Sequence, residues 1–232
     1  MKMRFLTELF DLLAPRECAI CSQRLAATES VICAECHLNL PLTGFQQTPY
    51  ENPLAHLFWG LIPVEKAIAY FYYIPHTQTS RMIHQLKYSQ QPEIGEHLGR
   101  IMARELQRHD FFSDIDAIVP VPVTSQRRRE RGYNQSMEIA RGIREVARLP
   151  ILSKTIKRIH FTTSQTRMRG WERRENVADA FRLVHQEEAR GKHLLLVDDI
   201  ITTGATITAC AQELCKAGGV RISIAALGFS KG

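Results

Sequence analysis

One segment, from His193 to Leu214, restricts the fold of this chain more than any other part of the sequence. It begins with an apolar run, Leu194 to Val197, which has the length of a strand buried on both faces. Two acids follow, Asp198 and Asp199, and the run TTGAT then leads into a helical apolar pattern. A buried strand, a polar loop and a helix in this order predict a βα unit of a parallel sheet.

The chain beyond about residue 60 alternates in the same way between strand-like and helix-like stretches. Expected strands are 67–74, 115–121, 180–184, 194–197 and 220–229, and expected helices are 79–88, 93–109, 135–149 and 206–217. This alternation predicts an α/β fold, a parallel sheet covered by helices on both faces. In such sheets ligands bind beyond the carboxyl ends of the strands, where the two acids are expected.

The loop from Thr202 to Thr206 has the composition of a phosphate-binding loop. Small hydroxyl residues and a glycine let the backbone wrap around a phosphate, and the helix N-terminus adds N–H groups and a favourable dipole. The neighbouring carboxylates suit sugar hydroxyls and a hard cation such as Mg²⁺. An acidic strand tip before a capped helix is the simpler interpretation, but it explains only one Asp and one Thr. A phosphorylated ribose is therefore favoured, and a Walker loop is excluded because its motif is absent.

The run LLLVDDIITTGAT resembles the phosphoribosyl-pyrophosphate (PRPP) motif of type I phosphoribosyltransferases. The resemblance implies that Asp198 and Asp199 contact the ribose 2- and 3-hydroxyls, and that they are the catalytic acids if the chain is an enzyme. It implies that Mg²⁺ is chelated by ribose and pyrophosphate oxygens. The residues that it places around the 5-phosphate are Thr202, Thr203, Gly204, Ala205 and Thr206.

Positive charge is concentrated in one segment, although the net charge of the whole chain is only +6. Residues 124–174 contain 14 Lys and Arg against 4 Asp and Glu, and arginines cluster in RRRERGYNQ and again between 158 and 174. The planar guanidinium fork grips phosphate oxygens, so this segment is expected to face phosphate, pyrophosphate or nucleic acid. A solvated surface is the alternative interpretation.

Four of the six cysteines form two Cys-x2-Cys pairs, Cys18/Cys21 and Cys33/Cys36, separated by 11 residues. Two such turns can aim four sulfurs at one tetrahedral point, which suits a structural Zn²⁺ ion. A redox dithiol is the weaker alternative, because redox pairs normally occur singly and near a βαβ unit. The segment is too small to bury a core of its own, so metal binding would supply its folding free energy.

In chain order, the four-cysteine segment, HQLKY, VPVP with RGYNQ, ERRENVADAF and VDDIITTGAT resemble the ComF family, which includes competence-associated and GntX-like proteins. The match runs from about Cys18 to the C-terminus. It implies Lys87 near the pyrophosphate and Arg131 and Arg158 in the same cleft. Further residues implied to line that cleft are Asn134, Thr162, Gln165, Arg173 and Asn176.

These features predict two parts, an N-terminal helix (3–14) with a zinc-ribbon-like module over residues 1–60, and a type I phosphoribosyltransferase fold over 61–232. The favoured function is binding of PRPP with Mg²⁺ in support of DNA uptake or processing in natural transformation. Single-stranded DNA and DNA-uptake proteins are the candidate partners. The alternative is an active phosphoribosyltransferase with an unidentified nitrogen acceptor, since neither a general base nor a base-recognition hood is recognisable. No apolar stretch approaches the roughly 20 residues of a membrane span, so a cytoplasmic protein without membrane insertion is expected.

Overall fold

The computed structural model describes residues 16–159 and 180–230. Its central sheet consists of four parallel strands in the order β1-β6-β5-β2. The strands are β1 (Val64–Tyr72), β2 (Ala117–Pro120), β5 (His193–Ile201) and β6 (Arg221–Phe229). All four are predominantly buried, as the apolar runs predicted, because helices cover both faces. The expected parallel α/β fold is confirmed.

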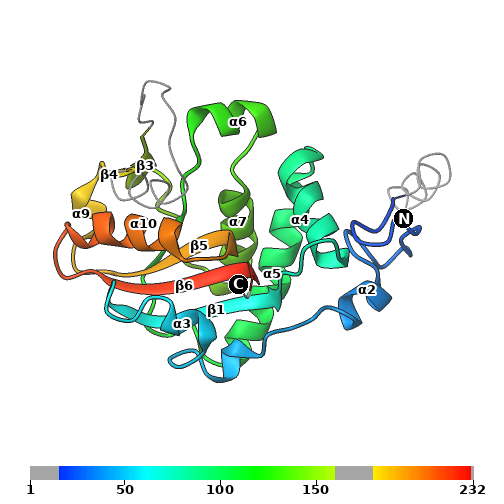
Figure 1. The fold of residues 1–232 in the computed structure, drawn as a ribbon, viewed down its shortest axis with the longest axis horizontal. Helices are drawn as coiled ribbons and strands as arrows, with labels where there is room; N and C mark the ends of the chain where they lie inside the picture. The colour runs from blue at the N-terminus through cyan, green and yellow to red at the C-terminus, as the bar shows by residue number, and fades with distance from the viewer. Residues whose placement is uncertain (1–15, 160–179, 231–232) are drawn as a thin grey trace.

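Two pairs of helices enclose the sheet (Figure 1). Helices α5 (Pro92–Arg108) and α7 (Gln135–Ala147) lie on one face, while α3 (Pro53–His56) and α10 (Ala205–Cys215) lie on the other. Helices α5 and α7 cross with their backbones in contact, since a Cβ on Gly142 would lie 2.0 Å from the carbonyl oxygen of Glu96. The two helices therefore form a tightly packed layer behind the strands.

The remaining elements lie around this core. Helix α4 (Gln78–Tyr88) precedes α5, and α6 (Ser125–Arg131) projects from the body without a buried residue (Figure 1). The bounds of α4, α5, α7 and α10 and of the strands in the main sheet agree with the sequence expectations within three residues at the ends, except in β5, whereas α3 and α6 were not expected. The other short elements are α2 (Ala34–Leu38), η1 (Phe45–Gln47), β3 (Ile156–Arg158), β4 (Phe181–Leu183) and α9 (Gln186–Ala189).

The strand expected at 180–184 forms, but outside the parallel sheet. It is β4, which pairs in antiparallel fashion with β3. Both strands are three residues long, with Lys157 and Arg182 exposed at their centres. A strand with an exposed charged residue at its centre suits a sheet with one face in solvent. It does not suit the main sheet, whose strands are apolar because both faces are buried.

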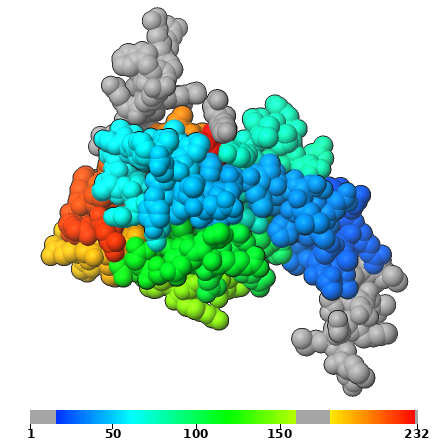
Figure 2. Space-filling model, turned by 90° about the horizontal axis from the view of Figure 1, so that it is seen from below, coloured from blue at the N-terminus to red at the C-terminus, as the bar shows by residue number. Residues whose placement is uncertain are grey.

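The cysteine-containing segment packs directly on the body. Ser30 Oγ lies 3.0 Å from His97 Nδ1 on α5, and His37 Nε2 lies 3.3 Å from the Tyr70 hydroxyl on β1. Residues 41–62 then run along the sheet and form a continuous surface with the segment that precedes them (Figure 2). Their buried Phe45 ring packs edge-on against Tyr72. Among the described residues, the structure contains no helix long and apolar enough to cross a membrane.

Candidate functional site

The two acids lie within β5, and not beyond its tip as the sequence predicted. β5 continues to Ile201 because β6 is equally long and pairs with it past both acids. β2 is shorter, since its last pairing joins Pro120 to Val197. The β2 side of β5 is therefore open from Asp198 onwards, at the carboxyl end of the sheet where ligands of α/β proteins bind.

Among the described residues, each acid has one side-chain partner, and the two partners come from different helices. Lys87 Nζ, on α4, lies 3.0 Å from Asp199 Oδ2. The Ser136 hydroxyl, in the first turn of α7, donates to Asp198 Oδ1 at 3.0 Å. Lys87 was expected at this site from the family resemblance. Ser136 was missed, although it directly follows the RGYNQ run.

The electrostatics of the pair depend strongly on Asp198. Burial raises the pKa of the Asp198 carboxyl to about 7, and the neighbouring charge of Asp199 adds to this effect. The backbone N–H of Asp199, the Ser136 hydroxyl and Lys87 oppose the increase without cancelling it. At neutral pH and without a ligand, Asp198 and Asp199 therefore share one proton part of the time. A cation or a hydroxyl group that binds to the two carboxylates would favour the loss of this proton.

The loop from Thr202 to Thr206 lies beside Asp198, as the sequence predicted. Asp198 and residues 200–207 line a small cavity of 40 Å³, which brings a carboxylate and the start of α10 together. Gly204 takes a left-handed conformation with φ +75°, and a Cβ there would lie 2.8 Å from the ring of Phe58. Glycine is required at this position for both reasons, and its small size lets the backbone of the loop pack against Phe58, in the turn after α3.

The last turn of α4 connects the acid pair to the basic segment. The guanidinium of Arg131, at the end of α6, lies over the Tyr88 ring at 5.3 Å and donates to Gln135 Oε1 at 2.8 Å. The Tyr133 hydroxyl donates to the carbonyl of Leu86 at 2.6 Å. Residues 86, 87 and 88 therefore each contact a different part of the site, which sequence reasoning did not anticipate.

The predicted cleft residues lie in more than one cavity. Arg131 and Asn134 line a cavity of 630 Å³ together with Arg128 and Lys154. Neither Asp198 nor Asp199 lines this cavity. Arg158 lies nearer to the acid pair: burial and Arg127 lower the pKa of its guanidinium, and the charge of Asp198 acts in the opposite direction. The other residues implied for the cleft lie outside the described residues: Thr162, Gln165, Arg173 and Asn176. The expected N-terminal helix (3–14) also lies outside them.

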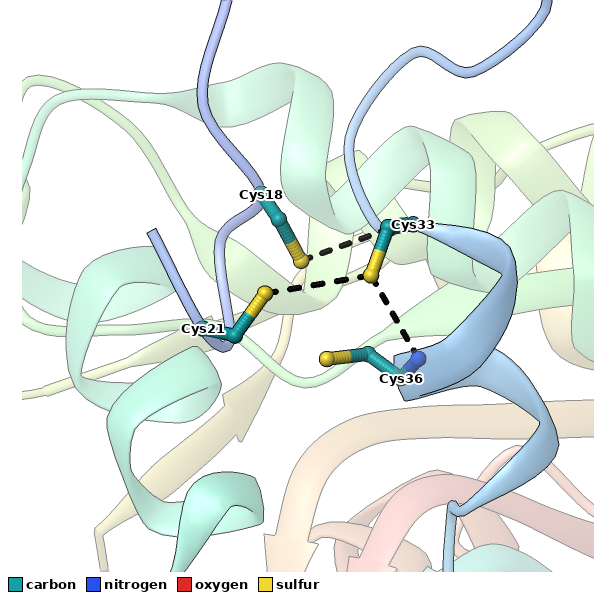
Figure 3. A group of neighbouring side chains, drawn as sticks. All are labelled: Cys18, Cys21, Cys33 and Cys36. Carbon is teal, nitrogen blue, oxygen red and sulfur yellow. Dashed lines mark hydrogen bonds between the residues drawn. The ribbon is translucent and has the colours of Figure 1, made fainter. Parts of the chain in front are cut away.

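The four cysteines form one cluster (Figure 3), as their spacing predicted. Their Sγ atoms all lie within 4.8 Å of one another, and Cys21 Sγ and Cys33 Sγ are 3.8 Å apart. A tetrahedral zinc ion with bonds of about 2.3 Å to sulfur separates its ligands by roughly 3.8 Å, so the arrangement fits such an ion. His37 is not part of the cluster and contacts Tyr70 instead.

Backbone N–H groups support the sulfurs as they do in thiolate sites. The N–H of Cys33 donates to Cys18 Sγ at 3.3 Å, and the N–H of Cys36 donates to Cys33 Sγ at 3.4 Å. Burial raises the pKa of Cys18, but the hydrogen bonds around it outweigh burial and the pKa falls to about 7, whereas burial and the neighbouring thiols raise the pKa of Cys36. The convergence of the four sulfur atoms is what allows the cluster to hold a metal ion that prefers sulfur.

Comparison with known proteins agrees with these features. The family model described as "Phosphoribosyl transferase domain" matches residues 84–229. The DNA utilization protein YhgH of Escherichia coli O157:H7 is 30% identical over 210 residues, which cover 89% of this chain and 87% of that protein. Competence protein F of Haemophilus influenzae is 32% identical over 149 residues (62% of this chain, 65% of that protein), and competence protein ComFC of Bacillus subtilis is 27% identical over 101 residues (44% and 39%).

Two solved structures resemble parts of the chain. One is the allosteric regulatory enzyme of purine biosynthesis, with a TM-score of 0.37 and 21% identity over 56% of this chain. The other is glutamine PRPP amidotransferase from B. subtilis complexed with ADP and GMP, with a TM-score of 0.40 and 20% identity over 60% of this chain. The matched regions are 25% and 30% of those longer chains.

Proposed function

The chain belongs to the ComF family of phosphoribosyltransferase-domain proteins, and on that premise we propose that it binds PRPP together with Mg²⁺. The observation that carries the proposal is the cavity shared by Asp198 and the loop up to Ile207. It offers a carboxylate for ribose hydroxyls directly beside N–H groups for a phosphate, and this pairing is what a phosphorylated ribose requires.

The neighbouring side chains suit the rest of the ligand. Asp198 and Asp199 would accept hydrogen bonds from the ribose hydroxyls, and the loop from Thr202 to Thr206 would hold the 5-phosphate. Lys87 is close enough to the acids to reach a pyrophosphate oxygen on the same ribose, with Arg131 and Arg158 beyond it. Mg²⁺ bound to ribose and pyrophosphate oxygens would reduce the repulsion between the negative carboxylates and the negative phosphates.

Isothermal titration calorimetry with PRPP, with and without Mg²⁺, tests this proposal. The double variant Asp198→Asn/Asp199→Asn removes both acceptor charges, and we expect it to weaken PRPP binding at least tenfold. The matched control is Asp110→Asn, an exposed acid at the opposite end of the sheet, in a left-handed conformation that Asn tolerates. Equal PRPP affinity in the double variant and the control would contradict the proposed site.

For the biological role, we propose support of DNA uptake or processing, because relatives over most of the chain are named for DNA utilization and competence. The exposed arginines of α6, Arg127, Arg128 and Arg129, supply a candidate contact for single-stranded DNA. Changing all three to Gln should weaken oligonucleotide binding and flatten its dependence on salt concentration. An unchanged salt dependence would remove α6 from the interface.

An active phosphoribosyltransferase is the second candidate, favoured by the β3-β4 pair. This antiparallel pair carries Arg158, whose guanidinium pKa is lowered by burial while the charge of Asp198 opposes this decrease, so we propose that the pair is near enough to the acids to cover an acceptor. Pyrophosphate release from PRPP and Mg²⁺, assayed with each nucleobase and with none, distinguishes the candidates. Release that disappears in the Asp198→Asn/Asp199→Asn variant supports an enzyme, whereas PRPP binding without release supports a binding function.

A further inference from the structure

A cavity of 750 Å³ is lined in part by Lys87 and shares no lining residue with the cavity at the phosphate loop. One wall is formed by α4, one by the connection from β1 to α4, and one by Ile20 and Ser22 of the cysteine-containing segment. Its volume lies within the range of roughly 300 to 1,000 Å³ that is typical of small-molecule sites. The cavity has no role in the PRPP site described above, apart from the shared Lys87.

Its charge is one-sided. Arg81 and Lys87 line it, together with His76 and His84, and no acidic side chain of the described residues does so. A solvated protein surface normally mixes charges of both signs, whereas a concave wall with cations alone attracts an anion. The ligand is therefore expected to be negatively charged.

The remaining lining favours a flat ring. Tyr73 and Tyr88 contribute aromatic surface, and the His84 and Tyr88 rings contact each other with centroids 4.7 Å apart. Tyr88 keeps 61% of its surface exposed although both His84 and the Arg131 guanidinium lie against its ring. Ser22, Ser80 and Gln85 add hydrogen-bonding groups at the wall. Aromatic faces beside cations and amide or hydroxyl groups are the combination that holds a nucleobase and a phosphate.

We infer that this cavity is a second ligand site, which binds a nucleoside monophosphate. The base packs against the aromatic rings and the phosphate faces Arg81 and Lys87. Because Lys87 also pairs with Asp199, a nucleotide in the cavity competes for the cation that neutralises the acid pair. Occupancy of the cavity and binding at the acids are thereby linked, and each ligand changes the affinity for the other.

The cysteine cluster shapes this site. Ile20 lies between Cys18 and Cys21, and Ser22 follows directly with φ +60°. Both residues belong to the turn that carries the first two cysteines. Metal binding by the cluster would hold this turn and with it one wall of the cavity, which would give the N-terminal segment a part in ligand binding.

The test is a titration of the full-length, zinc-loaded protein with AMP, followed by two-dimensional ¹H–¹⁵N NMR. Backbone signals of residues 76–88 should shift, while those of residues 202–206 should not. Arg81→Gln should weaken AMP binding about tenfold or more, since it removes a charge-assisted contact. Arg144→Gln, an exposed arginine of α7, is the matched control and should leave AMP affinity unchanged.

Three results would overturn the inference: no shift with AMP, GMP or CMP at millimolar concentration, shifts confined to residues 202–206, or unchanged AMP affinity in Arg81→Gln. Failure of PRPP binding is a separate outcome, because it is read from residues 198–206 in a titration with PRPP. Removing the metal with a chelator should weaken AMP binding as well. Unchanged AMP affinity after chelation would contradict the supporting role of the cysteine cluster.

Discussion

Lowering the pH from 8 to 6 should weaken PRPP binding about tenfold through Asp198. Its pKa is about 7 in the free protein, raised by burial and by Asp199. Ribose hydroxyls donate to ionised carboxylates, so binding favours the deprotonated form and the free protein must lose its proton first. With a pKa near 7, the competent fraction is roughly 0.9 at pH 8 and 0.1 at pH 6, and affinity falls in the same ratio.

Calorimetry at pH 6, 7 and 8 in buffers of different ionisation enthalpy measures both the affinity and the protons released. About 0.9 proton should leave Asp198 per PRPP bound at pH 6, and about 0.1 at pH 8. PRPP itself titrates in this range, so Asp198→Asn supplies the baseline at each pH. The reasoning is refuted if wild type and Asp198→Asn show the same relative loss of affinity between pH 8 and pH 6.

Three further predictions concern stability and metal binding. Because folding raises the pKa of the Asp198 carboxyl, its ionisation costs stability from about pH 4 upwards, and the cost is complete above pH 7. Asp198→Asn should therefore raise Tm at pH 8 by at least about 2 °C, and this gain should disappear as the pH falls towards 4. An equal gain at both pH values would contradict this sign. Gly142→Ala should lower the free energy of unfolding by about 2 kcal/mol or more in urea, because its Cβ meets the backbone of α5, whereas exposed Gln107→Ala should change it by under about 0.5 kcal/mol. Cobalt added to the metal-free protein should give a thiolate-to-metal charge-transfer band, and Cys21→Ser should weaken this band. Cobalt binding without the band would exclude a site made of four sulfur ligands.

The sequence predicted those parts of the site whose residues are neighbours in the chain. Two Cys-x2-Cys turns already fix which sulfurs converge, and the TTGAT run carries both the glycine and the hydroxyls of its loop. The apolar runs predicted a sheet buried on both faces, because period and length are local properties. These predictions required no knowledge of which elements lie side by side.

The contacts that the sequence could not predict join elements distant in the chain. The length of β5 depends on β6, because the backbone of the acids forms ladder pairs with residues that come 28 positions later. Ser136 reaches Asp198 because α7 packs against β5, and its hydroxyl has no local signature of that role. The strand expected at 180–184 was likewise counted in the alternation, and its partner β3 was not expected, since a strand of three residues has too short a pattern to indicate its partner.

The last turn of α4 shows why a helix that contributes no acid can still decide how the site behaves. The Leu86 carbonyl accepts a hydrogen bond from the Tyr133 hydroxyl, Lys87 pairs with Asp199, and the Tyr88 ring lies under the Arg131 guanidinium. A shift of this turn by one residue would exchange all three contacts at once, because consecutive helix residues point about 100° apart. The same turn faces the cavity whose far wall includes Ile20. A ligand or metal that moves this wall can therefore act on the acid pair through the last turn of α4, in addition to the contacts of the cysteine-containing segment with β1 and α5.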